Sequence, residues 1–80
     1  MNKPQHGKYN QTANLFWENV EFVMSKRNIS WKDLAAQLGI DPRTLASKKA
    51  TRTNISLGSA AEIADAIGTS VDRLIYGRPE

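Results

Sequence analysis

The residues best suited to chemistry in this 80-residue chain lie in one short segment, Asp41–Lys49. Its pattern predicts a helix whose exposed face carries only small polar and cationic side chains, and such a face fits a groove of duplex DNA. Arg43 is the strongest candidate on it, because a planar guanidinium can donate to both O6 and N7 of one guanine. A phosphate contact by Arg43 is the alternative. The chemistry indicated is recognition of nucleic acid.

Two short helices must position this face. Residues 30–38 predict the first, and Ser30 with Asp33 forms a near capping box that fixes its start. Asp41 followed by Pro42 predicts an abrupt start for the second, because a carboxylate N-cap there precedes a proline at the first helical position. The turn between them is three residues long and contains a glycine. Two helices joined in this way form a helix-turn-helix unit.

Ala35, Gly39 and Leu45 give this unit a resemblance to the Cro and phage-repressor (XRE-type) helix-turn-helix family. Ala35 would let the two helices approach closely, Gly39 would adopt a left-handed helix exit, and Leu45 would anchor the second helix. The resemblance covers roughly residues 15–77. It implies an all-α fold, a compact five-helix orthogonal bundle like the lambda-repressor helix-turn-helix domain.

The start of the second helix in such a unit reaches base edges in the major groove. Thr44 and Ser47 can bond a base or offer the thymine methyl a small apolar contact. Lys48 is at the next exposed position, although the family usually has an apolar residue there. The expected base contacts are Pro42, Arg43, Thr44, Ser47 and Lys48.

The resemblance places the segment after this helix against the sugar-phosphate backbone, where contacts position more than they specify. Lys32, with the free amides at the start of the first helix, would hold another phosphate. Trp31 stands where the family usually has a glutamine, and it can pack against sugar. The expected phosphate contacts are Trp31, Lys32, Lys49, Thr51, Arg52, Thr53 and Asn54.

The charge distribution supports this placement. Residues 42–54 contain four cations and no acid, whereas residues 55–80 carry a net charge of −2. Positive charge therefore gathers beside the predicted recognition helix, and a solvated basic loop is the alternative.

Three further helices complete the predicted bundle. The first runs over residues 14–27, with Thr12 or Asn14 as its N-cap, and Asn28 ends it. Trp17 and Phe22 lie off its apolar stripe, so we expect one of them to lie under the N-terminal segment or a neighbouring subunit. The residues of the stripe are Phe16, Val20, Val23, Met24 and Arg27.

Serines predict the starts of the last two helices. Ser56 caps a helix that ends at Gly68, and Ser70 caps a short one that ends at Gly77. The residues expected to face inward in the former are Leu57, Ile63, Ala64 and Ile67. The apolar residues of the latter are Val71, Leu74 and Ile75.

The domain organisation predicted is a flexible tail over residues 1–13, one helix-turn-helix domain over residues 14–77 and a short tail over residues 78–80. The N-terminal tail is polar and lacks periodicity. A basic arm on DNA, using Lys3 and Lys8, is the alternative.

Composition limits the other classes of function. The chain has no cysteine and one histidine, so we expect no cofactor, no metal site and no enzymatic activity. It has no signal peptide pattern and no run of about 20 apolar residues, so we expect a cytoplasmic protein without a membrane partner.

The leading hypothesis is a sequence-specific transcriptional regulator of double-stranded DNA, most like a phage or prophage repressor. We expect a homodimer on a pseudo-palindromic operator, with half-sites about 34 Å apart. Ile75 and Tyr76 are the expected dimer contacts, and completion of the monomer core is their alternative role. A protein-interaction module, antitoxin-like or adaptor, is the second hypothesis, favoured if Trp31, Trp17 and Phe22 are exposed together.

Overall fold

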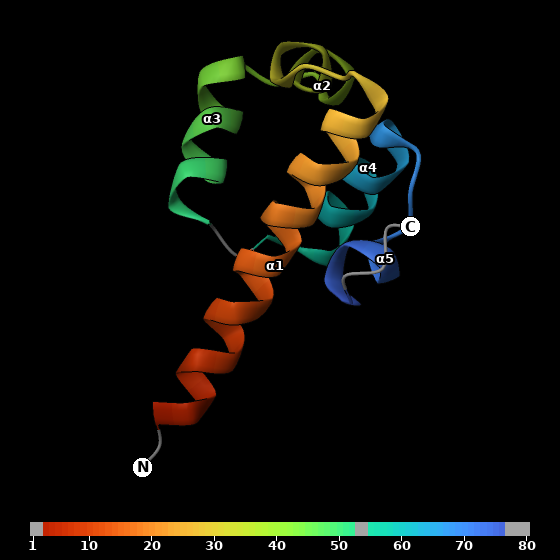
Figure 1. Cartoon of the computed structure of the whole chain (residues 1–80). Helices are drawn as coiled ribbons and strands as arrows, with labels where there is room; N and C mark the ends of the chain where they lie inside the picture. Colours follow the sequence, from red (N-terminus) through yellow and green to blue (C-terminus); the bar gives the residue numbers. More distant parts are fainter. Residues whose placement is uncertain (1–2, 53–54, 77–80) are drawn as a thin grey trace.

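A computed structural model describes residues 3–52 and 55–76, with side chains from Thr12 onward. These residues form five helices and no strand, so the predicted all-α fold is confirmed (Figure 1). The helices are α1 (Lys3–Arg27), α2 (Trp31–Leu38), α3 (Pro42–Thr51), α4 (Leu57–Ile67) and α5 (Val71–Tyr76).

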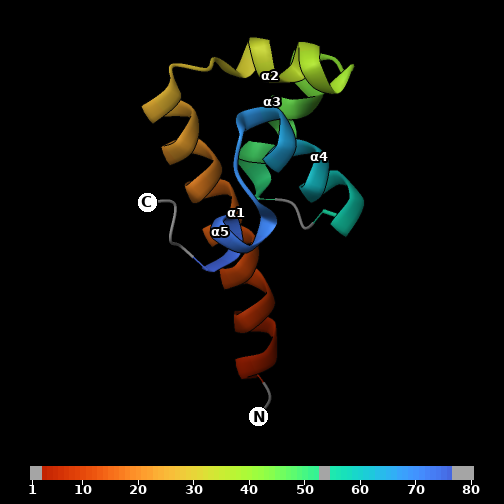
Figure 2. The same ribbon diagram turned by 90° about the vertical axis from the view of Figure 1, so that its right-hand side faces the viewer.

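The arrangement of these helices encloses a single apolar core. Helix α1 packs against α4 and α5, while α2 packs against α3 and α4. Figure 2 shows α2 lying across one end of the bundle, with the N-terminal part of α1 extending from the opposite end. The predicted stripe residues Phe16, Val20, Val23 and Met24 are buried in this core.

Trp17 corrects the expected position of the aromatic residues on α1. Its side chain is fully buried, in edge-to-face contact with Phe16 at a centroid distance of 5.3 Å. It joins the core because it precedes Val20 and Met24 by three and seven positions, which is helical spacing. Phe22 is half exposed and lies beneath the Lys26 ammonium, 5.6 Å from the ring centroid.

The start of α1 also differs from the sequence prediction. The helix begins at Lys3 rather than near Asn14, so most of the segment expected to be a tail has a helical backbone. Pro4 falls in the first turn, where its missing N–H removes no helical bond. Adding residues to an existing helix is easier than nucleating one, so a core-packed helix can extend into a polar segment.

Polar contacts tie the end of α1 to α4. Arg27 does not enter the core with its stripe; its Nη1 instead donates to the carbonyls of Ile67 at 2.9 Å and Gly68 at 2.6 Å. Gly68 has φ +81, and an added Cβ there would clash with the same Arg27 guanidinium. The left-handed backbone conformation therefore favours glycine at the end of α4, and any larger residue there would also displace the Arg27 guanidinium.

The serine caps predicted for the last two helices are confirmed. Ser56 Oγ accepts from the Ser59 amide at 3.1 Å, and Ser70 Oγ accepts from the Arg73 amide at 3.2 Å. The prediction that Leu57 faces inward is wrong, because this residue is 75% exposed. It occupies the first position of α4, where the side chain has no preceding turn to pack on.

Within the described ranges, no helix combines the length and apolar character required to cross a lipid bilayer.

Removal of the Trp17 side chain tests this core. We expect Trp17→Ala to lower the free energy of unfolding by about 3–5 kcal/mol, because a fully buried ring leaves a cavity. Phe22→Ala, the matched aromatic control on the same helix, should cost less than about 1 kcal/mol. Denaturant unfolding followed by circular dichroism measures both, and equal losses would contradict the burial of Trp17.

Candidate nucleic-acid interface

The helix-turn-helix unit is built from local caps. Ser30 Oγ accepts from the Asp33 amide at 3.0 Å and begins α2, and Asp41 Oδ1 accepts from the Arg43 amide at 2.8 Å and begins α3. Gly39 has φ 71 and ends α2 in the left-handed conformation. The predicted starts and the predicted turn are therefore confirmed, and α3 runs to Thr51, beyond the predicted end at Lys49.

Burial of Leu45 determines which face of α3 is exposed. Leu45 lies in the core with Leu34 and Ala35 of α2. With about 100° per residue, Arg43 and Ser47 point to the opposite side of the helix. The predicted base-contact residues Pro42, Arg43, Thr44, Ser47 and Lys48 are all exposed.

The Arg43 side chain is almost fully exposed to solvent. It is 94% exposed, and its Nε lies 3.8 Å from Oδ1 of Asp41, the residue that caps the helix. A contact of this kind on the surface is weak and screened by salt. The guanidinium is therefore free to reach an external acceptor at the first turn of α3.

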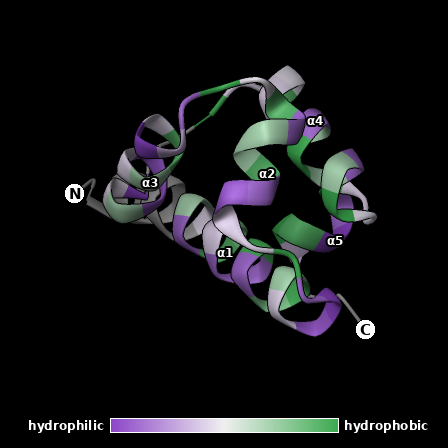
Figure 3. Cartoon of the chain, turned by 90° about the horizontal axis from the view of Figure 1, so that it is seen from above, coloured by the Kyte–Doolittle hydropathy of each residue, from purple (hydrophilic) through white to green (hydrophobic). Residues whose placement is uncertain are grey.

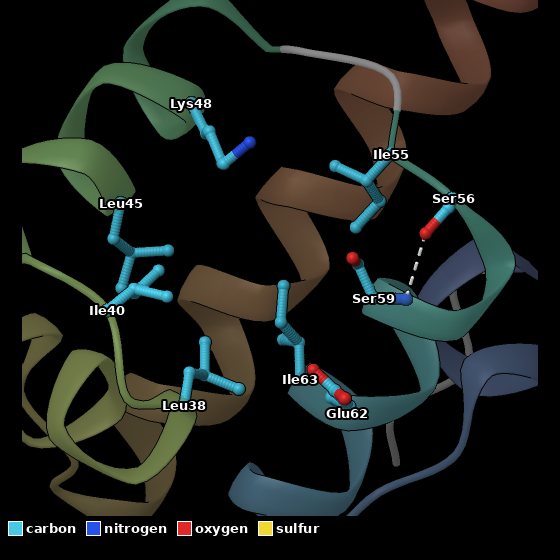
Figure 4. Close-up of a pocket in the computed structure, with 9 residues that line it drawn as sticks. All are labelled: Leu38, Ile40, Leu45, Lys48, Ile55, Ser56, Ser59, Glu62 and Ile63. Atoms are coloured by element: carbon cyan, nitrogen blue, oxygen red, sulfur yellow. Dashed lines mark hydrogen bonds between the residues drawn. The ribbon is translucent and has the colours of Figure 1, made fainter.

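Lys48 occupies a different side of α3 from Arg43. It lies on the rim of a hollow of about 230 Å³ between α3 and α4 (Figure 4). Five positions separate Lys48 from Arg43, which places the two about 140° apart around the helix. The pocket is lined by Leu38, Ile40, Leu45, Lys48, Ile55, Ser56, Ser59, Glu62 and Ile63.

Lys49 and Arg52 lie on the other flank of Leu45, beside α1. Lys49 Nζ is 3.8 Å and Arg52 Nη1 is 4.0 Å from Oε2 of Glu21. Lys49 Nζ also lies 5.1 Å from the ring centroid of Trp31, the first residue of α2. The segment free of acids in the sequence thus has an acidic neighbour in space.

Glu21 is the residue of this region that the sequence analysis missed. Its partners lie 28 and 31 positions further along the chain, so no local pattern links them. Only the folded arrangement, which places the end of α3 within ion-pair distance of α1, brings the carboxylate and the two cations together.

The remaining predicted phosphate contacts are distributed as follows. Lys32 is exposed in the first turn of α2. Thr51 is exposed, and its hydroxyl donates to the Ser47 carbonyl at 2.9 Å. Arg52 ends α3 in a left-handed conformation with φ 53. Thr53 and Asn54 lie outside the described residues.

The predicted dimer residues lie far from α3. Figure 3 shows α3 and α5 on opposite sides of the molecule. Tyr76 is 72% exposed, and Ile75 is partly buried against the core. Ile75 and exposed Leu57 line one apolar groove, together with Thr12, Ala13, Phe16, Ile55, Ala60 and Val71.

Comparison with known proteins gives the family. The model of the Cro/C1-type HTH DNA-binding domain matches residues 19–79, which is most of the chain and includes α2 to α5. Searches of curated proteins and of solved structures each returned no match. The match contains the whole helix-turn-helix unit described above. The chain therefore belongs to the Cro/C1-type helix-turn-helix family and is a DNA-binding transcription regulator.

Proposed function

We propose that the protein is a sequence-specific regulator of the phage or prophage repressor type, which inserts the start of α3 into the major groove of double-stranded DNA. The observation that carries the proposal is the exposed face of α3 opposite Leu45. It presents a guanidinium and two hydroxyl side chains, and these groups suit hydrogen bonding to base edges. Repression would follow from occupation of promoter DNA.

Arg43 is the residue that we propose determines which DNA sequence is preferred. Arg43 is the second residue of α3 and its side chain is 94% exposed, so its guanidinium can reach O6 and N7 of a guanine. Thr44 and Ser47 would contact neighbouring bases, with Pro42 beside them. Lys48, which lies toward the pocket, would reach the DNA from the edge of this face.

Backbone contacts would come from the ends of the two helices. The N-terminal amides of α2 and the exposed Lys32 would bind a phosphate, on the side of the first turn away from Asp33. Trp31 would pack against sugar, and the segment 49–54 would approach a second stretch of backbone. These contacts would position α3 in the groove.

A homodimer is proposed because one α3 reads only a few base pairs. The apolar groove lined by Leu57 and Ile75, with Tyr76 nearby in sequence, supports the proposal. None of its lining residues belongs to α3, so two copies joined there would leave both recognition helices free for a pseudo-palindromic operator.

The protein-interaction alternative loses its main support. It depends on Trp17, Trp31 and Phe22 forming one exposed aromatic patch. Trp17 is fully buried and Trp31 is partly covered by Lys49, which leaves Phe22 as the exposed member of the three.

Substitution of Arg43 tests the proposed reading of bases. Duplexes selected from a random pool supply the preferred site. On that site we expect Arg43→Ala to weaken binding by about 1–3 kcal/mol and to relax preference at one base pair. Arg73→Ala on α5 removes the same charge far from α3 and should change affinity much less. Fluorescence anisotropy measures both, and equal effects of the two variants would refute the assignment.

Substitution of two exposed residues, Leu57 and Tyr76, tests the proposed dimer surface. Leu57→Ser with Tyr76→Ser should leave the fold intact, because surface substitutions change stability little. We expect the double variant to bind a single half-site like the wild type and to lose cooperative binding to a duplex with two half-sites. Unchanged cooperativity would place the dimer contact elsewhere, and sedimentation of the protein on each duplex provides the stoichiometry.

A further inference from the structure

Glu21 forms ion pairs with Lys49 and Arg52, two cations at the end of the recognition helix. Its Oε2 is 3.8 Å from Lys49 Nζ and 4.0 Å from Arg52 Nη1, across the space between α1 and α3. The side chain of Glu21 is 40% exposed, and those of Lys49 and Arg52 are 33% and 34% exposed. Solvent, and therefore an external anion, can reach part of each side chain, although the Nη1 atom of Arg52 is itself buried.

The two ion pairs of this cluster, at 3.8 and 4.0 Å, are too long to be hydrogen bonds. A charge-assisted hydrogen bond to a phosphate has a length of about 2.7–2.9 Å, which is much shorter. Arg52 Nη1 is buried and has no hydrogen-bond acceptor among the described residues. The Lys49 ammonium contacts both the Glu21 carboxylate and the face of the Trp31 ring. Both cations therefore remain available as hydrogen-bond donors to a phosphate oxygen, which Arg52 Nη1 reaches once its guanidinium turns toward solvent.

We propose that Glu21 is an internal competitor for DNA phosphate, which holds Lys49 and Arg52 on the protein and limits the affinity for the DNA backbone. The proposal rests on the proposed function, since it assumes that the α3 end faces the duplex. When the protein meets DNA, a phosphate must displace the Glu21 carboxylate to gain either cation. The negative charge of Glu21 then remains close to the phosphate and opposes it.

This arrangement affects backbone binding more than base reading. Arg43 lies at the other end of α3 from Arg52, and its nearest charged partner is Asp41. Glu21 therefore weakens a contribution that every DNA sequence offers equally, while the predicted guanine contact is untouched. Weaker backbone binding raises the sequence specificity of a regulator, because contacts to phosphate contribute equally to binding at every DNA sequence.

The test replaces Glu21 by its neutral isostere and uses a duplex of arbitrary sequence. We expect Glu21→Gln to bind this duplex about tenfold more tightly than the wild type at 50 mM salt. The plot of log affinity against log salt should steepen by about 0.9 for each cation that gains a phosphate. Fluorescence anisotropy over a series of salt concentrations gives both quantities.

Two further variants make the result specific. Glu18→Gln removes the same charge from an exposed position one turn earlier on α1, so it reports the general effect of charge and should leave the slope nearly unchanged. The triple variant Glu21→Gln, Lys49→Gln, Arg52→Gln should not show the increase in DNA affinity that we expect for Glu21→Gln alone. Thermal unfolding followed by circular dichroism checks that each variant is folded.

The outcomes separate this proposal from the proposed function. If the wild type binds duplex DNA but Glu21→Gln binds no more tightly than Glu18→Gln, Glu21 is no competitor and the inference is wrong. If a folded Glu21→Gln protein binds less tightly than the wild type, Glu21 instead positions α3. If the folded wild type binds no duplex at low salt, the proposed function itself fails.

Discussion

Burial of Leu45 is the interaction on which the rest of the interface depends. With Leu34 and Ala35, it seats α3 on α2 and fixes the rotation of α3 about its axis. That rotation exposes Arg43, Thr44 and Ser47, turns Lys48 toward the pocket and brings Lys49 beside α1. One apolar contact thus divides a basic helix into an outward face, available to bases, and two flanks with different neighbours.

Local sequence signals predicted the framework of the helix-turn-helix unit because each acts over a few residues. The caps at Ser30 and Asp41 and the left-handed glycine at position 39 depend only on neighbouring backbone groups. The same holds for Ser56, Gly68 and the left-handed Asn28, which has φ 60. The predicted all-α bundle follows from such signals combined with helical apolar periodicity.

Features that depend on distant parts of the chain were not predictable from these signals. Helical spacing places Trp17 beside the apolar stripe of α1, but only the packing of α4 and α5 against α1 determines that this side of the helix is covered. Leu57 is exposed because it begins a helix at the edge of the core. Glu21 meets Lys49 and Arg52 only after folding, so a segment without acids in the sequence acquired an acidic partner. The candidate site was therefore predicted in its location but not in its electrostatics.

The central claim is that the outer face of α3 contacts DNA. Titration of the isotope-labelled protein with its selected duplex, followed by amide nuclear magnetic resonance, tests it most directly. The account predicts that the largest shifts fall on residues 42–47 and on the first turn of α2, with α5 little changed at the level of a single half-site. Shifts confined to α4 and α5, with the amides of α3 unmoved, would contradict it.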